Sequence, residues 1–382
     1  MNKFIFYGWI AAAIALLLYS FTQVDLSLTL SQMSIWQGIQ KFFQQIGYFN
    51  RPLSTVLYVA IIGSMFFLYG LTLLGVKKKE ISQKQLFRII IAISIILFFS
   101  YNAFSYDLFN YIFDAKIVTH YGQSPYEHKA LDYPGDPMLS FMHWTHRTYP
   151  YGPVWLLLTV PLSFIGFGYF LVTFYLFKLL MVGSFIWSVY LIRRIAIKLG
   201  SDPSFSAVAF ALNPLVLIES LVSAHIDIVM IAFGLFGILM FLERKFIASL
   251  IGIVGSIFIK FATALLIPGI IAKVLFKVKN ETFLYILVLS MLGAVILSTF
   301  RTNFQPWYLL VVLPFSAFVQ NKYFVMIPVF VVSAAALFQY VPFLYLGNWN
   351  DPVPIILNRM MIISVVMSAL LTLFWKLSKS KL

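Results

Sequence analysis

Long apolar runs recur along the whole chain and are separated by short charged segments. Each run has roughly 17 to 25 residues, the length that an α-helix needs to cross the hydrocarbon core of a bilayer. Hydrophobic residues make up 61% of the 382 positions and charged residues only 10%, whereas about a quarter of an ordinary soluble domain is charged. Mean hydropathy is +0.92. The sequence therefore predicts an all-α protein with one integral membrane domain over residues 1–382.

The basic residues cluster in the short segments between the apolar runs, as at 77–88, 193–198 and 273–279. In a soluble protein the net charge of +14 would suggest a nucleic-acid partner, but this clustering is typical of the cytoplasmic loops of a membrane protein. We therefore expect membrane lipids rather than nucleic acid around the chain, and a location in the cytoplasmic membrane. The first run, residues 4–21, lacks a small-residue cleavage site and is expected to be a retained span.

Length and charge together predict a polytopic helical bundle of about 12 spans (11–13), with both termini inside. Residues 154–165 are apolar but short and lie between Pro153 and Gly166. They predict a re-entrant or juxtamembrane helix. Residues 23–52 predict an interfacial helix on the outer face. The expected spans are 4–22, 53–75, 87–104, 169–192, 204–218, 225–242, 246–259, 262–276, 283–300, 306–319, 323–345 and 356–375.

Residues 105–153 are the one long stretch that a membrane cannot hold. A polar segment of about fifty residues is long enough to be functional rather than a connector. Because the basic clusters lie in the other loops, this segment is expected to be a large extracytoplasmic catalytic loop. Five of the thirteen acidic residues fall in or beside it: Asp107, Asp114, Glu127, Asp132 and Asp136.

With that topology, the unusual polar residues of the later spans fall on the same side as the large loop. Ionisable groups at membrane depth cost several kcal/mol unless they face a polar cavity or one another, so their gathering is a functional-site hypothesis. A cavity with carboxylates and cations suits transfer of a group from a phosphate. The gathered residues are Glu219, His225, Asp227, Lys260, Arg301, Gln305, Trp307, Tyr308 and Arg359.

Asp107 is the best candidate for a general base, because it is the first acid after the third span. The alternative is an inert, solvated carboxylate. Asp114 lies seven residues later on the same helical face and could instead pair with Lys116 or Arg147. Lys178, in the middle of a span, is expected to reach a lipid headgroup or a partner elsewhere in the bundle.

Several other residues have structural explanations that stay open. Lys260 could bind a phosphate or anchor at the interface by snorkelling. The aromatic side chains could stack on a sugar ring or belong to the aromatic belt at the membrane edge. These side chains are Tyr149, Tyr151, Trp307 and Tyr308.

Five segments, in order, resemble a known enzyme family. They are SYDLFNYIFDAKIVTHYGQSPY (105–126), RTYPYGPVWLLL (147–158), NPLVLIESLVSAHIDIVMIAF (213–233), IKFATALLIPGII (259–271) and FQPWYLLVVLPF (304–315). Together they are similar to the polyprenol-phosphate-mannose-dependent mannosyltransferases of the GT-C superfamily. The resemblance covers roughly residues 85–320. It implies a GT-C bundle, a lipid-linked sugar donor and a glycan or glycolipid acceptor on the extracytoplasmic face.

The resemblance also implies roles for particular residues. Asp107 matches the acid that serves as general base in a single inverting displacement. His225 and Asp227 match the HxD element of the family, written HND there and HID here, so Ile226 departs from the pattern. Charge and position, rather than a motif, make Lys260, Arg301 and Arg359 candidates for the donor phosphate. The candidates for the sugar or the acceptor are Asp114, Tyr149, Tyr151, Glu219, His225, Asp227, Gln305, Trp307 and Tyr308.

No cofactor is expected to be required. Mg²⁺ or Mn²⁺ is optional, because carboxylates could bind one but Asp107 and Asp114 form no adjacent pair that demands it. No metal site is expected among the loop histidines, whose spacing matches no compact ligand pattern. A transporter or flippase for lipid-linked sugars remains the alternative function, although a secondary transporter would be expected to show repeated halves with broken helices.

Overall fold

The structure is a computed structural model that describes residues 2–379; Met1 and residues 380–382 lie outside it. Within residues 2–379 the chain forms helices and short 3-10 or π-helical turns and no strand, apart from an isolated bridge between Lys129 and Thr148. The all-α prediction is confirmed.

Six helical segments of the described chain are long and apolar enough to cross a membrane. Two further short helices, bent by 59° at a break, could form a seventh crossing. The predicted count of about twelve would need the shorter apolar helices to cross as well, and it stays a prediction. The six segments are 3–23 (α1, Asn2–Ser20, and the turn after it), α3 (Arg51–Lys77), α7 (Phe170–Leu199), α13 (Asn280–Thr302), 323–346 (α15, Tyr323–Phe338, with α16, Tyr340–Leu346) and α17 (Val353–Lys379).

The other helices are shorter. The 154–165 segment lies within a helix of 13 residues, which is shorter than a membrane span requires. The 23–52 segment contains a helix at Ser34–Gln44. The bounds of the shorter helices are α2 (Ser34–Gln44), α4 (Gln83–Phe98), α5 (Asp107–Thr119), α6 (Pro153–Ile165), α8 (Pro203–Ala211), α9 (Pro214–Leu217), α10 (Asp227–Leu242), α11 (Phe246–Ile257), α12 (Ile267–Leu275) and α14 (Leu313–Ser316).

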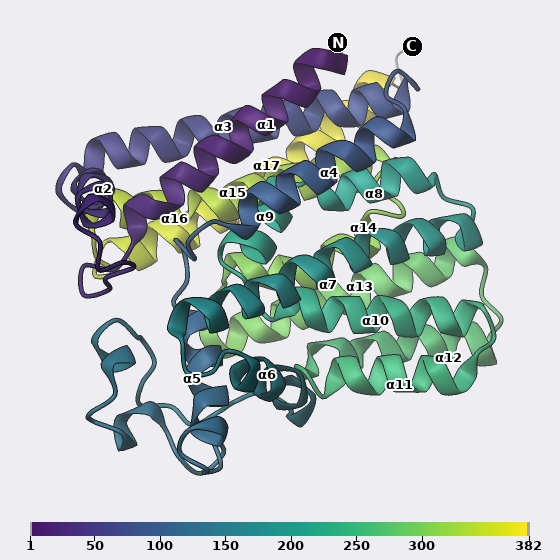
Figure 1. The fold of residues 1–382 in the computed structure, drawn as a ribbon. Helices are drawn as coiled ribbons and strands as arrows, with labels where there is room; N and C mark the ends of the chain where they lie inside the picture. Colours follow the sequence, from purple (N-terminus) through teal and green to yellow (C-terminus); the bar gives the residue numbers. More distant parts are fainter. Residues whose placement is uncertain (1, 380–382) are drawn as a thin grey trace.

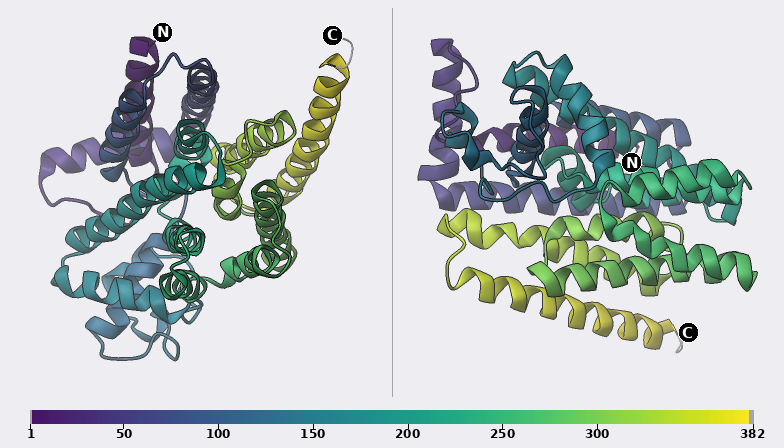
Figure 2. Two further views of the ribbon diagram at one scale, coloured as in Figure 1. Left: turned by 90° about the vertical axis from the view of Figure 1, so that its right-hand side faces the viewer. Right: turned by 90° about the horizontal axis from the view of Figure 1, so that it is seen from below.

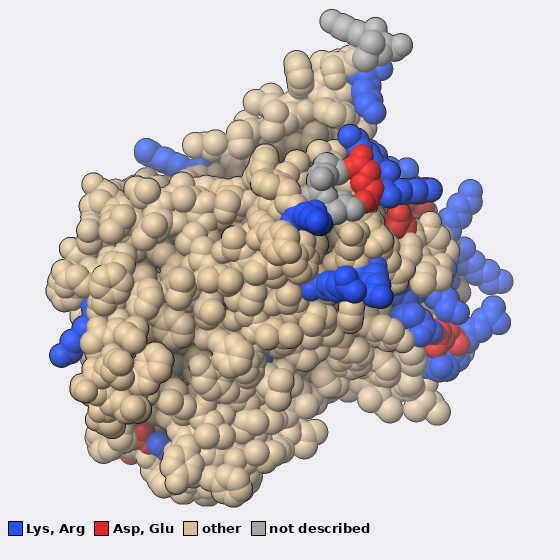
Figure 3. Space-filling view, turned by 45° about the horizontal axis from the view of Figure 1, so that its top comes forward, with Lys and Arg blue, Asp and Glu red and all other residues tan. Residues whose placement is uncertain are grey.

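The helices run between two ends of the molecule that differ in how many lysine and arginine side chains they carry. At one end, on the right of Figure 1, lie the two described ends of the chain and the turns that join α7 to α8 and α10 to α11. The segment around α5 and α6 lies at the other end, at the lower left. In Figure 3 most of the lysine and arginine side chains in view gather on the right, and the remaining surface is largely uncharged. The charge asymmetry expected of a membrane protein is therefore present in three dimensions.

The helices α8 and α9 with the π-helical turn Ile218–Val222 occupy the centre of the bundle. Figure 2, left, shows this region between the N-terminal helices and the yellow C-terminal helices. The break between α8 and α9 has a local cause, because Pro214 lacks an N–H and the Asn213 side chain accepts from the amide of Leu215 at 3.0 Å instead. This break lets the polar residues that follow turn toward the loop end.

The helices α10 and α11 pack against each other through glycines. A β-carbon at Gly252 would lie 2.7 Å from the Cα of Gly237, so a larger residue there would push the two backbones apart. This close packing fixes the direction in which α11 ends. It thereby places the segment Phe258–Lys260, which contributes to the site.

Candidate active site

Asp107 is the first residue of α5, and local contacts fix the chain just before it. The Ser105 hydroxyl accepts a hydrogen bond from the backbone N–H of Asp107 at 3.1 Å, and the side-chain amide of Asn102 donates to the Ser105 carbonyl at 2.8 Å. Tyr106 donates its hydroxyl to Asp25, which follows α1, at 3.0 Å. The Asp107 side chain keeps 18% of its surface exposed, whereas that of His225 beside it is completely buried.

His225 lies between two carboxylates. Its Nδ1 is 3.5 Å from Asp107 Oδ2, and its Nε2 is 3.2 Å from Glu219 Oε2. His225 and Glu219 are both completely buried. The ring of Trp307 stacks on the imidazole, with centroids 4.2 Å apart and planes 19° apart, and Tyr340 donates its hydroxyl to Glu219 Oε1 at 2.9 Å. Asp107, His225 and Glu219 thus form a row of polar side chains, of which only Asp107 is partly exposed.

A sharp turn after the Ile218–Val222 segment brings His225 next to Glu219. The Ile218–Val222 π-helix ends at Ser223, Ala224 takes the left-handed conformation with φ of +58°, and the His225 amide donates to the Glu219 carbonyl at 2.9 Å. The reversal brings two residues that are six positions apart face to face. In a straight helix, residues at that separation would not lie on the same face.

Asp227 and Lys260 form an ion pair close to this row. Lys260 Nζ is 2.9 Å from both carboxylate oxygens of Asp227. The Asp227 side chain is almost fully buried, whereas that of Lys260 keeps 27% of its surface exposed and its amine lies 5.9 Å from the centre of the Tyr308 ring. The acid therefore orients the amine while leaving part of it accessible.

The YGP segment (residues 151–153) and the residue after it are hydrogen-bonded to the backbone just before Lys260. The amide of Gly152 donates to the Ile259 carbonyl at 3.2 Å, and the amide of Val154 donates to the Phe258 carbonyl at 3.1 Å. A β-carbon at residue 152 would lie 2.0 Å from the Phe258 oxygen, so only glycine permits this approach. Tyr149 is buried and donates its hydroxyl to the Gly152 carbonyl at 2.8 Å. The ring of Tyr151 packs 5.5 Å from that of Tyr111.

The charges of the cluster act on Asp107. Burial alone raises the pKa of this carboxyl, but the contact with His225 and the positive charges of Lys260 and Arg147 hold the pKa below its ordinary value. Asp107 is therefore ionised at neutral pH. It can accept a proton from a hydroxyl that approaches its exposed side.

Asp114 behaves differently, although it lies on the same helix. Burial raises its pKa to about 8, so at neutral pH most of the carboxyl is protonated. The alternative of pairing with Lys116 or Arg147 is wrong. Lys116 contacts Asp136, which also accepts from Tyr121 at 2.7 Å, and Arg147 lies over the ring of Trp144 at 4.3 Å.

Three of the predicted site residues form no ion pair or side-chain hydrogen bond with this cluster in the described chain. Arg301 is exposed in the last turn of α13, Arg359 is exposed on α17, and neither has an ion pair in the described chain. Gln305 is half-buried and immediately precedes the turn that carries Trp307. Binding of a donor phosphate by the two arginines stays a prediction.

The roles of two contributors could not be predicted from sequence motifs. Arg147, whose charge lowers the pKa of Asp107, immediately precedes the TYPYGP stretch, and this position was the only signal. Tyr340 lies within an apolar span, and nothing in its neighbourhood indicates that it contacts Glu219 across 121 residues of sequence.

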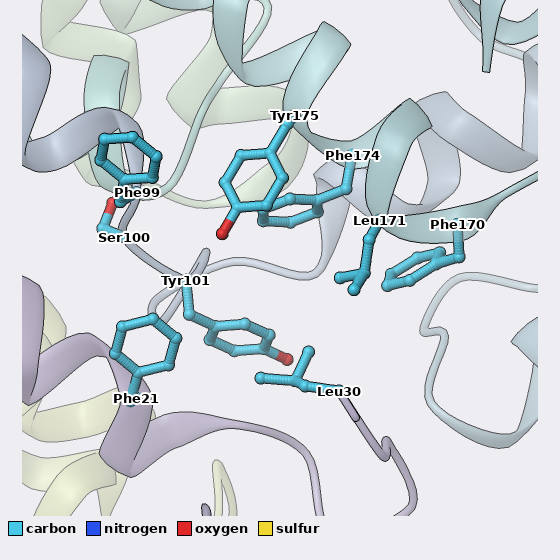
Figure 4. A pocket seen from close by; sticks show the side chains of 9 residues that line it. All are labelled: Phe21, Leu30, Phe99, Ser100, Tyr101, Phe170, Leu171, Phe174 and Tyr175. Atoms are coloured by element: carbon cyan, nitrogen blue, oxygen red, sulfur yellow. The ribbon is translucent and has the colours of Figure 1, made fainter. Parts of the chain in front are cut away.

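An apolar cavity of about 130 Å³ lies near the start of the large loop. Figure 4 shows its side chains, which come from the turn after α1, the 23–52 segment, the end of the third predicted span and the start of α7. None of the predicted site residues lines it. The lining residues are Phe21, Leu30, Phe99, Ser100, Tyr101, Phe170, Leu171, Phe174 and Tyr175.

Comparison with known proteins gives a family and one curated relative. The profile of the family described as "Alpha-(1->6)-mannopyranosyltransferase, N-terminal domain" matches residues 9–276. Alpha-(1->6)-mannopyranosyltransferase A of Corynebacterium glutamicum is 24% identical over 185 residues, which are 48% of this chain. The match covers only 38% of that relative's length. No solved structure matches the chain significantly.

Proposed function

Because the chain belongs to the alpha-(1->6)-mannopyranosyltransferase family, matched over residues 9–276, we propose that it transfers a mannosyl group. The donor is a polyprenyl-phosphate-linked mannose, and the acceptor is a hydroxyl of a lipid-linked or cell-envelope glycan. The reaction takes place on the extracytoplasmic face of the cytoplasmic membrane. The observation that carries this proposal is the partly exposed side chain of Asp107, which feels the positive charge of the partly exposed side chain of Lys260.

In the proposed step an acceptor hydroxyl oxygen attacks the anomeric carbon while the bond from that carbon to the phosphate oxygen breaks. Asp107 takes the hydroxyl proton, and polyprenyl phosphate leaves with the bonding electron pair. One displacement inverts the anomeric centre. Asp107 is suited to this role because its pKa is lowered and its side chain is partly exposed.

Cations stabilise the charge that develops on the departing phosphate. Lys260 is the first candidate, because Asp227 orients its amine without covering it. Arg301 and Arg359 are further candidates and would have to reach the donor from exposed positions. We assign the sugar and the acceptor to the surrounding groups Asp114, Tyr149, Tyr151, Glu219, His225, Asp227, Gln305, Trp307 and Tyr308.

The location on the extracytoplasmic face is supported by the concentration of basic side chains at the end opposite α5 and α6. The reaction as written requires no cofactor. A divalent cation is an optional addition, and activity measured with and without a chelator tests it.

The test is an assay of purified protein with polyprenyl-phosphate mannose and a glycan acceptor. Wild type is expected to form a glycosidic product, and Asp107→Asn is expected to lose about 10²- to 10⁴-fold in rate, the usual contribution of a general base. Glu127→Gln is the matched control, because it removes an exposed acid of the same loop. Equal product from wild type and Asp107→Asn would remove Asp107 as the base. Movement of the lipid-linked sugar across vesicles without product would support a flippase instead.

A further inference from the structure

Lys178 is a buried cationic residue that the proposed reaction does not use. It lies in the middle of α7, and its side chain is completely buried. Within residues 2–379 no carboxylate forms an ion pair with it. A lysine in such a place is costly in a membrane, so its retention needs a specific reason.

Three oxygens surround the Lys178 amine. It donates to the Ser100 hydroxyl at 3.0 Å, to the Val222 carbonyl at 3.4 Å and to the Leu221 carbonyl, which lies closer. Three acceptors match the three N–H donors of an ammonium group. Ser100, which Figure 4 shows beside the apolar cavity, also donates to the Leu97 carbonyl at 2.6 Å and is thereby fixed in place.

The two carbonyls need these donors because the helix ends there. In a continuing α-helix, the amides of residues 225 and 226 would bond to Leu221 and Val222. The chain instead reverses at Ala224, and the His225 amide donates to Glu219. A cation at the C-terminal end of a helix also interacts favourably with the helix dipole.

The same turn carries the buried part of the candidate active site. Glu219 lies within the Ile218–Val222 segment, and His225 follows its end by three residues. We propose that Lys178 is a positioning residue: it holds the turn that places His225 between Asp107 and Glu219. This proposal rests on the proposed function of Asp107, but it makes separate predictions. Lys178 itself contacts none of the reacting groups.

The first test compares Lys178→Met with Lys178→Arg and with Lys198→Met. Methionine keeps the length of the side chain without a donor, arginine keeps donors, and Lys198 is an exposed lysine of the same helix. Displacement of the catalytic geometry is expected to lower kcat of Lys178→Met about 10- to 100-fold. The KM for the donor should stay within about 2-fold of wild type, because the candidate phosphate-binding residues Lys260, Arg301 and Arg359 lie outside the displaced turn. The arginine variant should recover most of the activity, and Lys198→Met should equal wild type.

A second test asks whether Lys178 acts through His225. If it does, adding Lys178→Met to His225→Gln should lower kcat by less than about a further 2-fold, although Lys178→Met alone lowers kcat much more. If the kcat losses of the two single variants multiply in the double variant, the two residues act independently and the proposal is overturned. Wild-type kcat in Lys178→Met would overturn it as well.

Two further measurements keep the outcome decisive. If Lys178→Met does not fold, Ser100→Ala, which removes one partner of the amine, takes its place in the same cycle. If the wild-type protein makes no mannosyl product, the proposed function fails, and a structure of the variant then decides the positioning role. An imidazole that stays 3.5 Å from Asp107 Oδ2 in that structure would overturn it.

Discussion

At the scale of single residues, the contact with His225 lowers the pKa of Asp107. Replacement by glutamine removes a contact that lowers the pKa of Asp107 but leaves the burial that raises it. The pKa of Asp107 in His225→Gln should therefore rise. The carboxylate would then be protonated, and inactive as a base, at a higher pH than in wild type.

This change is measured as the acid limb of kcat/KM against pH, which reports groups of the free enzyme. The limb should move to higher pH in His225→Gln and stay in place in the control His128→Gln, a change in the exposed part of the loop. An acid limb at the same pH in wild type and His225→Gln would contradict the role of the imidazole.

Asp114 provides a second pH-dependent prediction, with the opposite sign. Its pKa is raised to about 8, so the folded protein binds a proton that the unfolded chain releases near pH 4, as an ordinary aspartate does. The stability that Asp114 contributes is full below pH of about 4 and is lost as the pH rises to about 8. Asp114→Asn has no such loss. Its thermal unfolding temperature should therefore rise relative to wild type between pH 5 and 8. A constant difference over that range would exclude a raised pKa.

The members of the candidate site could be predicted from sequence, but only as a set of residues on the same side of the membrane as the large loop. Asp107, His225, Asp227 and Lys260 all carry a charge or a ring nitrogen in an apolar setting, which makes them visible. Their pairing could not be predicted. Whether Lys260 meets Asp227 or a solvated phosphate depends on where α11 ends, and this depends on its close packing with α10.

At the scale of elements, the junction between the YGP segment and the end of α11 determines where Lys260 lies. A β-carbon at residue 152 would meet backbone atoms of Phe258, which cannot move aside as a flexible side chain could. Gly152→Ala should therefore shift Lys260 and lower kcat/KM about 10- to 100-fold. Gly135→Ala is the matched control, because nothing lies within 4 Å of the added carbon. Activity and thermal stability of the two variants, measured side by side, check this; unchanged kcat/KM in Gly152→Ala would contradict it.

The long helices were predictable as elements because length and apolarity alone define them. The predicted spans 53–75 and 283–300 lie within α3 and α13. The predicted span 204–218 is instead two helices broken at Pro214. Proline indicates such a break, but the 59° bend depends on the neighbouring helices and on the polar turn that follows.

At the scale of the whole molecule, the arrangement of charge predicts which end faces the cytosol. The chain contains no cysteine, so single cysteines report their own position without background. Gly135→Cys in the large loop should react with a membrane-impermeant maleimide in intact cells. Lys245→Cys, in the turn between α10 and α11, should react only after the cells are opened. The reverse pattern would place the candidate site on the cytoplasmic side.

The hydrogen bond between Tyr340 and Glu219 has a consequence for biogenesis. The two residues are 121 positions apart, so during translation Glu219 enters the bilayer well before its donor has been made. Until α16 arrives, one oxygen of this carboxylate lacks its hydroxyl partner in a nonpolar environment. A nascent chain stalled before α16 should therefore be a preferred target of membrane quality-control proteases, so that maturation of the buried cluster requires a helix that lies far from Glu219 in the sequence.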